Sequence, residues 1–229
     1  MTRKIVIPGE IIGKGDFLPG EGTQKKGDEV VAMRFGLAEE SGKLIKVIPI
    51  SGVYEPRRGN VVIGEVTNMI SNGWFIKIGP DDVGFLPLTE VPRFVNKDNL
   101  DEVMSLGDMA VADISIINRR GIDLSIRSRG LGKIEDGMIV EVNPYKVPRI
   151  IGREGSMIKL IKDETGCNIT VGQNGLIWIK GNSVDDELLA KKAILEITRK
   201  SMIDGLTEKI ENWFKANGKS KTKKVDEKK

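Results

Sequence analysis

The residue spacing best suited to chemistry in this sequence is Gly152-Arg153-Glu154-Gly155. Ser156 follows it and opens a run with apolar residues at helical spacing, so the second glycine should lie where a helix begins. Two glycines let a nucleic-acid backbone approach a loop closely, and the free N–H groups at a helix start attract phosphate. Arg153 adds a charged hydrogen-bond donor. The segment therefore predicts a loop that binds the backbone of a nucleic acid.

The residue types needed for catalysis are nearly absent. The chain has no histidine and one cysteine, Cys167, which excludes a Cys/His zinc site and every histidine-based acid–base or nucleophilic mechanism. The carboxylate clusters that remain are Asp81-Asp82, Asp101-Glu102 and Asp185-Asp186-Glu187. Each adjoins turn residues or a helix start, which is typical of a solvated acidic surface. We predict a protein that is not an enzyme and has no metal site and no cofactor.

The nucleotide-binding pattern G-x-x-x-x-G-K-[ST] is not present either. Gly36 and Gly42 are separated by five residues, and Leu44 follows Lys43 where Ser or Thr is required. The second candidate, Gly218-Lys219-Ser220, has Trp213 in the place of the first glycine. Neither segment predicts a nucleotide site.

Residues 137–200 alternate strands and helices in a characteristic order. We expect strands at Gly137–Val142, Asn168–Val171 and Leu176–Lys180, and helices at Val147–Ile151, at 156–165 and from Val184. This order surrounds the string Ile150–Lys159, which has the pattern I-I-G-x-x-G-x-x-I-K. The region resembles a type I KH domain, a fold that binds single-stranded nucleic acid.

The KH resemblance implies RNA contacts by the loop and its flanks, namely Ile151, Gly152, Arg153, Glu154, Gly155 and Lys159. Ile151 and Ile158 would form the floor of the groove for bases. Glu154 departs from the family, whose middle loop residues are basic or neutral; it weakens the attraction for phosphate or pairs with Arg153. Replacing both loop glycines by aspartate should weaken RNA binding without unfolding the domain. The alternative is a KH scaffold kept only for packing.

Residues 57–128 contain a second small β pattern. Strands are predicted at Asn60–Thr67, Trp74–Gly79, Val83–Pro87, Met109–Ile117 and Ile122–Ile126, with a helical patch at Leu100–Met104. Five strands interrupted between the third and fourth are typical of an OB-type barrel. Along the second strand, Trp74, Ile76 and Ile78 share one face, and Phe75 and Lys77 the other. One of these faces must fill the barrel.

The motifs of this region resemble the ribosomal S-one-type RNA-binding domain. They are 59–66 (G-x-V-x-x-G-x-V), Gly73-Trp74-Phe75-Ile76, Gly84-Phe85-Leu86 and Leu124-Ser125-Ile126-Arg127. The resemblance implies that Phe75 faces RNA with Lys77 beside it, while Phe85 either joins it or belongs to the core. Arg119 and Arg120, on the last loop, are candidates for phosphate contact. Asn72 and Pro87 stand where the family often has an aromatic residue and a histidine, which reduces the stacking platform.

Residues 1–56 predict a small β domain. Val30–Phe35 and Lys43–Pro49 are strand-like, and the turn-rich segment 39–42 between them indicates a hairpin. Closely spaced Pro and Gly residues before them leave no room for a long helix. Apolar residues are too few for a self-sufficient core, so we expect this domain to pack against the next domain or another chain.

The C-terminal part divides into a KH domain with an added helix, residues 129–214, and a basic tail. Residues 201–216 form a helical pattern with Trp213 and Phe214 that should pack on the KH domain. Residues 215–229 hold seven lysines and two acids, and we expect a disordered tail that attracts phosphates or only aids solubility. No apolar run reaches the ~18 residues of a membrane helix, and MTRKIVIPGE is not a signal peptide, so we expect a cytoplasmic protein.

The predicted fold is therefore multidomain, β-rich plus α+β: a small N-terminal β domain (1–56), a five-stranded OB-type barrel (57–128) and a type I KH domain with an extra C-terminal helix (129–214). This order, with the opening string Pro8-Gly9-Glu10 and 19–23 (PGEGT), resembles the RNA-binding cap subunits of the archaeal exosome. The resemblance implies a trimeric cap on a hexameric ring of phosphorolytic exoribonuclease subunits. The N-terminal domain would dock on the ring, and single-stranded RNA would be guided into its pore for 3′-to-5′ degradation.

Two alternatives remain open from the sequence: a transcription or translation factor that uses the same modules, and an enzyme related to polynucleotide phosphorylase. Transcription factors of the Nus type also place an S-one-type barrel before KH, but they normally carry KH domains in tandem, and this chain has room for one. Polynucleotide phosphorylases place KH before the barrel and carry a catalytic region that has no counterpart in this sequence.

Overall fold

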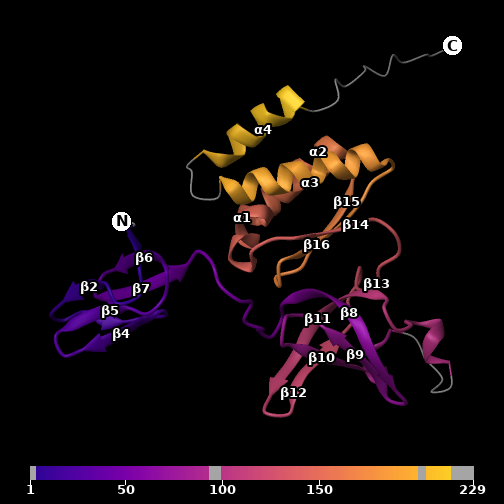
Figure 1. Ribbon diagram of the computed structural model, residues 1–229, viewed down its shortest axis with the longest axis horizontal. Helices are drawn as coiled ribbons and strands as arrows, with labels where there is room; N and C mark the ends of the chain where they lie inside the picture. Colours follow the sequence, from indigo (N-terminus) through magenta and orange to yellow (C-terminus); the bar gives the residue numbers. More distant parts are fainter. Residues whose placement is uncertain (1–3, 93–98, 201–204, 218–229) are drawn as a thin grey trace. The chain divides into compact units, whose positions relative to one another are not determined.

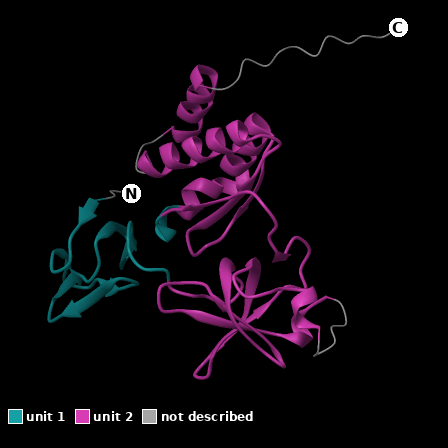
Figure 2. Ribbon diagram, turned by 45° about the vertical axis from the view of Figure 1, so that its right-hand side comes forward, with its two compact units in different colours: residues 1–54, 143–146 teal, residues 55–142, 147–229 magenta. Residues whose placement is uncertain are grey.

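The computed structural model describes residues 4–92, 99–200 and 205–217 (Figure 1). The chain divides into two compact units, one of residues 1–54 with 143–146 and the other of residues 55–142 with 147–229 (Figure 2). The second unit holds both a barrel and a KH domain. The predicted class, β-rich plus α+β, is confirmed.

The first unit consists of short strands in two small sheets. Its strands are β1 Lys4–Val6, β2 Ile11–Lys14, β3 Leu18–Pro19, β4 Thr23–Lys26, β5 Glu29–Ala32, β6 Gly36–Ser41 and β7 Leu44–Pro49. One sheet has the order β1-β6-β7-β3 and the other β2-β5-β4. The predicted strand at Val30–Phe35 is wrong in its extent and its partner. Strand β5 ends at Ala32 and pairs with β2 and β4, while the new strand β6 forms the hairpin with β7.

The core of this first unit is small. Val6, Ala32 and Val47 form one fully buried cluster against which Ile12 and Ala38 pack, and further apolar residues of the unit are buried, namely Val30, Val31 and Ile45. The opposite face of sheet β1-β6-β7-β3 stays exposed, because side chains alternate along β7 and those of Leu44 and Ile48 point outward. Cross-strand pairing places Ile5 in the row of Ile48, and Leu18 beside Leu44. We call these four residues the outer apolar face.

The barrel is built from the strands that the sequence predicted. Its elements are β8 Val61–Ile70, β9 Gly73–Lys77, β10 Val83–Pro87, η1 Leu88–Glu90, η2 Leu100–Glu102, β11 Met109–Asn118, β12 Gly121–Ser125 and β13 Gly132–Lys133. Strands β8, β9, β10, β12 and β11 close into a barrel, with β10 and β12 parallel and β11 returning to β8. The short strand β13, which extends the sheet at β11, was not predicted from the sequence.

Alternation along β9 decides which face fills the barrel. Trp74, Ile76 and Ile78 are at most 2% exposed, and the Trp74 Nε1–H donates to the Met104 carbonyl at 2.9 Å. Phe75 and Lys77 therefore face outward. Gly73 has a φ of 151°, and a Cβ there would lie 2.0 Å from the Leu86 carbonyl oxygen. Only glycine lets β9 and β10 approach so closely at this point.

The C-terminal elements form the predicted KH domain. They are β14 Met138–Glu141, α1 Val147–Ile151, η4 Arg153–Gly155, α2 Ser156–Thr165, β15 Asn168–Val171, β16 Leu176–Lys180, α3 Val184–Arg199 and α4 Leu206–Asn217. The short helix η3 Pro144–Lys146 follows β14 in the sequence but belongs to the first unit. The sheet order is β14-β16-β15, and α1, α2 and α3 cover one face of it (Figure 1). The added helix α4 buries Leu206, Ile210 and Phe214 in the same core, which confirms that it packs on the KH domain. Residues 218–229, most of the predicted tail, lie outside the described residues.

The turn between β15 and β16 joins the KH domain to the barrel. The side-chain amide of Asn174 donates to the Ile63 carbonyl at 2.7 Å and to the Ile78 carbonyl at 2.8 Å, and its oxygen accepts from the Ile63 N–H at 3.3 Å. The Gln173 N–H also donates to the Val61 carbonyl at 2.8 Å. One short turn therefore binds the backbone of two barrel strands, a contact that no sequence pattern indicated.

Candidate nucleic-acid interface

The KH loop has the backbone that its glycines suggested. Gly152 and Gly155 have φ values of 75° and 78°, in the left-handed region that glycine favours. The Gly152 N–H donates to the Pro148 carbonyl at 2.9 Å, which ends α1, and Gly155 precedes the first turn of α2. The loop is thus held between two helices, in a position where a phosphate backbone can approach its N–H groups.

The two glycines differ in what they tolerate. A Cβ at Gly152 would lie 2.7 Å from both the backbone nitrogen and the Cβ of Met157, a fully packed residue. A Cβ at Gly155 would meet nothing closer than Ile158 Cγ2 at 3.9 Å. The expectation that both glycines can be replaced without disturbing the fold is therefore wrong for Gly152. Gly155→Asp alone is the usable substitution, because aspartate tolerates the left-handed region better than most residues.

The predicted KH residues gather on and beside this loop. Arg153, Glu154 and Lys159 are exposed, while Ile151 and Ile158 are half-buried and pack against the KH core. Exposed cations above a partly exposed apolar floor are what a single strand needs, with phosphates on one side and bases on the other. Glu154 has a φ of 54°, which is uncommon for a residue other than glycine, asparagine or aspartate. Among the described residues 99–200, the suggested ion pair between Arg153 and Glu154 does not form.

The barrel presents a pair of aromatic rings on its outer surface. Phe75 and Phe85 lie opposite each other on β9 and β10, with ring centroids 5.1 Å apart and ring planes at 44°. Both are half-buried, so Phe85 contacts Phe75 and is not a buried core residue. Lys77 is exposed one pair further along the same face. Half-exposed rings beside a cation form the kind of platform on which bases stack.

Two polar side chains of the barrel, Asp123 and Arg127, were not among the residues predicted to contact RNA. Asp123 lies beside Phe85 across the parallel pair β10–β12, which adds a hydrogen-bond acceptor to the aromatic row. Its signal in the sequence was its position just before the L-S-x-R motif. Arg127, the arginine of that motif, donates to the Thr89 carbonyl and pairs with Glu90 at 3.5 Å. Arg127 therefore ties the end of β12 to the segment after β10.

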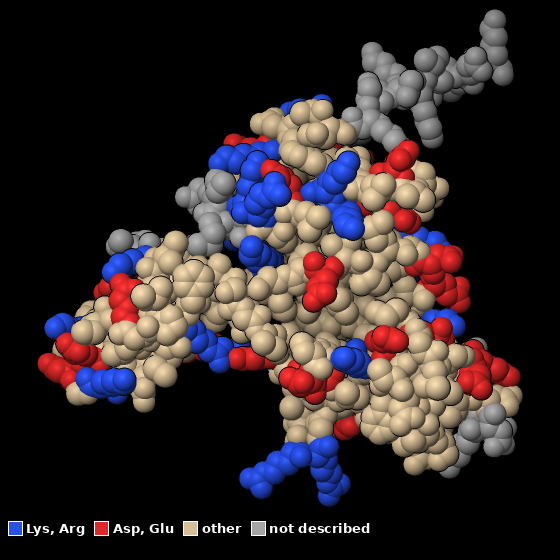
Figure 3. All heavy atoms as spheres, in the orientation of Figure 1, with Lys and Arg blue, Asp and Glu red and all other residues tan. Residues whose placement is uncertain are grey.

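The remaining predicted cations lie at one end of the barrel. Arg119 and Arg120 are exposed in the turn between β11 and β12, and the Arg120 N–H is held by the Asn118 side chain at 2.7 Å. Figure 3 shows basic side chains projecting from the end of the barrel that carries this turn in Figure 1. On the upper part of the visible face, further Lys and Arg side chains gather with a few Asp and Glu side chains beside them. Attraction for phosphate is thus local and not spread over a whole face.

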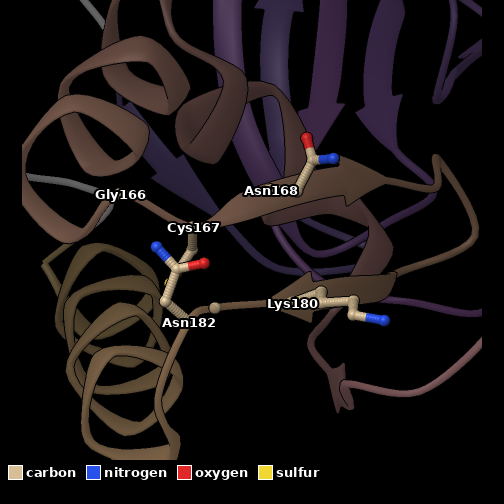
Figure 4. Close-up of a pocket in the computed structure, with 6 residues that line it drawn as sticks. Gly166, Cys167, Asn168, Lys180 and Asn182 are labelled. Carbon is tan, nitrogen blue, oxygen red and sulfur yellow. The ribbon is translucent and has the colours of Figure 1, made fainter.

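A polar pocket of about 400 Å³ lies at the other end of the KH domain (Figure 4). It is lined by Gly166, Cys167, Asn168, Lys180, Gly181 and Asn182. Burial raises the pKa of the Cys167 thiol, so this group stays protonated and is a poor nucleophile. Helix α2 separates the pocket from the KH loop by roughly 15 Å, at 1.5 Å per residue. The pocket is not part of the candidate interface.

The described residues contain no cluster of His, Cys, Asp and Glu that could hold a metal ion. In the same described ranges, no helix is long and apolar enough to span a bilayer.

Comparison with known proteins decides the family. A family model described as the N-terminal domain of the exosome RNA-binding protein Rrp4 matches residues 3–51, and a KH-domain model matches residues 137–185. The exosome complex component Rrp4 of Methanothermus fervidus is 36% identical over 213 residues, covering 93% of this chain and 95% of the relative. The chain belongs to the Rrp4 family. The Rrp4 of Nitrosopumilus maritimus is 35% identical, covering 95% of this chain and 98% of its own length.

Further relatives agree with Rrp4 membership. The Rrp4 of Methanosarcina barkeri is 39% identical over 97% of this chain and 85% of its own length. A solved structure of an exosome complex RNA-binding protein has a TM-score of 0.64 and 33% identity, over 72% of this chain and 97% of that chain. Members of the Rrp4 family are RNA-binding exosome components and not enzymes, which agrees with the missing catalytic groups.

Proposed function

We propose that this chain is one of three cap subunits on a hexameric ring of phosphorolytic exoribonuclease subunits in the cytoplasm. In this role it binds single-stranded RNA and guides the 3′ end into the pore for 3′-to-5′ degradation. The observation that carries the proposal is a division of tasks within the chain. The first unit exposes an apolar face, and the second carries the aromatic pair and the KH loop.

The proposed RNA contacts follow from the geometry. Phe75 and Phe85 stack on bases, with Lys77, Arg119 and Arg120 attracting phosphates along the barrel. On the KH domain, Gly152 and Gly155 admit the backbone, Arg153 and Lys159 supply positive charge, and Ile151 contacts a base. Because Asn174 binds the KH domain to the barrel, both sets of residues belong to one unit.

The ring-docking part of the proposal rests on the outer apolar face. Ile5 and Leu18 are more than half exposed, at 54% and 56%, and Leu44 and Ile48 are exposed at 41% and 40%. Lys46 and Glu39 form an ion pair of 2.9 Å in the middle of this face. An exposed apolar sheet face on a domain with a minimal core is typical of a surface that is covered in an assembly.

Two measurements test the proposed function. The purified chain, given labelled RNA with phosphate and Mg²⁺, should bind the RNA and leave its length unchanged. Native mass spectrometry of the protein drawn gently from its own cell extract should then show three copies on a ring of six ribonuclease subunits. Degradation by the lone chain would contradict the binding role, and recovery with polymerase or ribosomal components would identify a transcription or translation factor instead.

Truncating the aromatic pair should weaken RNA binding. Base–aromatic stacking contributes about 1–3 kcal/mol per base, so Phe75→Ala should raise the Kd for single-stranded RNA by roughly 5- to 150-fold. Phe75→Tyr keeps the ring and should stay close to the unmodified chain. Phe35→Ala removes a phenylalanine that is 42% exposed in the first unit and serves as the matched control. Equal affinities for Phe75→Ala and Phe35→Ala, measured by fluorescence anisotropy, would remove the aromatic pair from the RNA path.

A further inference from the structure

Glu154 carries a negative charge in the centre of a loop that is otherwise built to attract phosphate. Gly152 and Gly155 enclose the pair Arg153-Glu154, and Lys159 lies in the first turns of α2. The Glu154 side chain is exposed, and it has no ion pair or hydrogen bond within the described ranges 4–92, 99–200 and 205–217. Its charge is therefore available to whatever approaches the loop.

Glu154 is also held in an unfavourable backbone conformation. Its φ and ψ are 54° and 27°, which cost a residue with a Cβ roughly 1–2 kcal/mol relative to the right-handed region. Asparagine or aspartate can recover part of that by a local hydrogen bond, but the longer Glu154 side chain makes none within the described part of the chain. Packing does not explain glutamate at this position, because the side chain is exposed.

The sign of the electrostatic effect is set by the neighbouring charges. Glu154 cancels the charge of Arg153 next to it, so the loop segment 152–155 has no net charge. Two unit charges about 4 Å apart interact by about 1 kcal/mol even in water, which corresponds to roughly fivefold in affinity. A phosphate bound at this loop is attracted by Arg153 and by backbone N–H groups, and is repelled by Glu154.

We propose that Glu154 is a negative determinant of RNA binding, whose carboxylate weakens the phosphate contact of the KH loop so that RNA is released and moves on quickly. This inference rests on the proposed function, in which RNA passes over the chain toward a pore. A subunit that guides RNA must hold the strand without arresting it. The carboxylate achieves this at the loop, while Phe75 and Phe85 hold bases on the barrel.

The test uses the full chain with a fluorescein-labelled single-stranded RNA in stopped-flow and anisotropy measurements. Glu154→Gln removes the charge and keeps the backbone cost, so it should tighten binding about fivefold, mainly through slower dissociation, without changing the melting midpoint. Glu154→Lys should tighten it further and steepen the salt dependence by up to about 0.7 in log–log slope. Asp163→Asn is the matched control. It removes one exposed acid from α2, roughly 10 Å further along the helix and thus about a Debye length away, and should change affinity less than twofold.

The outcomes separate this inference from the proposed function. Equal RNA affinity of Glu154→Gln and Asp163→Asn would overturn the inference. Weaker binding by Glu154→Gln would also overturn it, because it would mean that the Glu154 carboxylate accepts a hydrogen bond from a base. Gly155→Asp, which adds a second carboxylate, should weaken binding severalfold. If Gly155→Asp and Glu154→Gln both leave affinity unchanged while Phe75→Ala weakens it, RNA binds the barrel and bypasses the KH loop. A chain that binds no RNA at any salt concentration would overturn both the inference and the proposed function.

Discussion

Replacing Asn174 by alanine should lower the free energy of unfolding by about 3 kcal/mol, because one side chain supplies three hydrogen bonds to barrel backbone groups. All three groups, the Ile63 N–H and the carbonyls of Ile63 and Ile78, belong to buried residues, so water cannot readily take the place of the Asn174 amide. Truncation would leave the carbonyls unsatisfied, which costs more than the loss of an exposed hydrogen bond. The Gln173–Val61 backbone bond would remain and cannot compensate.

The same variant should also uncouple the two domains. Trp74 reports on the barrel core, whereas Trp178 and Trp213 report on the KH domain. The experiment uses urea titrations of variants that keep either the barrel tryptophan or the two KH tryptophans. With Asn174 in place, the barrel and KH transitions should coincide, and with Asn174→Ala they should separate. Asn182→Ala, at an exposed asparagine of the same domain, is the matched control and should shift stability by less than about 0.5 kcal/mol. Coincident, unshifted transitions in Asn174→Ala would mean that other contacts join the domains.

Placing charge on the outer apolar face should abolish assembly with the ring. Ile5→Asp with Leu18→Asp puts two carboxylates on a surface that we propose is covered in the complex. Burying them unpaired should weaken docking by about 4 kcal/mol or more, roughly a thousandfold in Kd. Because both side chains are more than half exposed, the first unit should still fold. Co-purification from cell extract, followed by native mass spectrometry, measures the loss.

The control for this surface is an equally exposed leucine elsewhere. Leu106 is 61% exposed on the barrel, so Leu106→Asp changes the same residue type without touching the outer apolar face. We expect Leu106→Asp to retain the ring, and both variants to bind single-stranded RNA like the unmodified chain. If the variant with Ile5→Asp and Leu18→Asp recovers as much of the ring as Leu106→Asp does, the docking surface lies elsewhere.

Local sequence patterns were sufficient to predict the order of the modules and most element boundaries in the barrel and KH domain. Strand β10 lies at Val83–Pro87, and β15 and β16 lie within the residues predicted for them. These boundaries are local properties, because alternating apolar residues, helical spacing and glycine-bearing turns each act over a few residues. The KH loop was readable for the same reason, since two glycines between helices form one local motif.

Tertiary structure alone decided the features that depend on residues distant in sequence. The register of β9 on β10 made Phe85 a partner of Phe75, and the pairing of β6 with β7 replaced the expected partner of the first-unit hairpin. Met157 lies so close to Gly152 that this glycine cannot be replaced without disturbing the fold. Asn174 reads as an ordinary turn residue in the sequence, yet it binds backbone groups 96 and 111 residues away. Such partners are brought together only by sheet closure and domain packing, which no local pattern encodes.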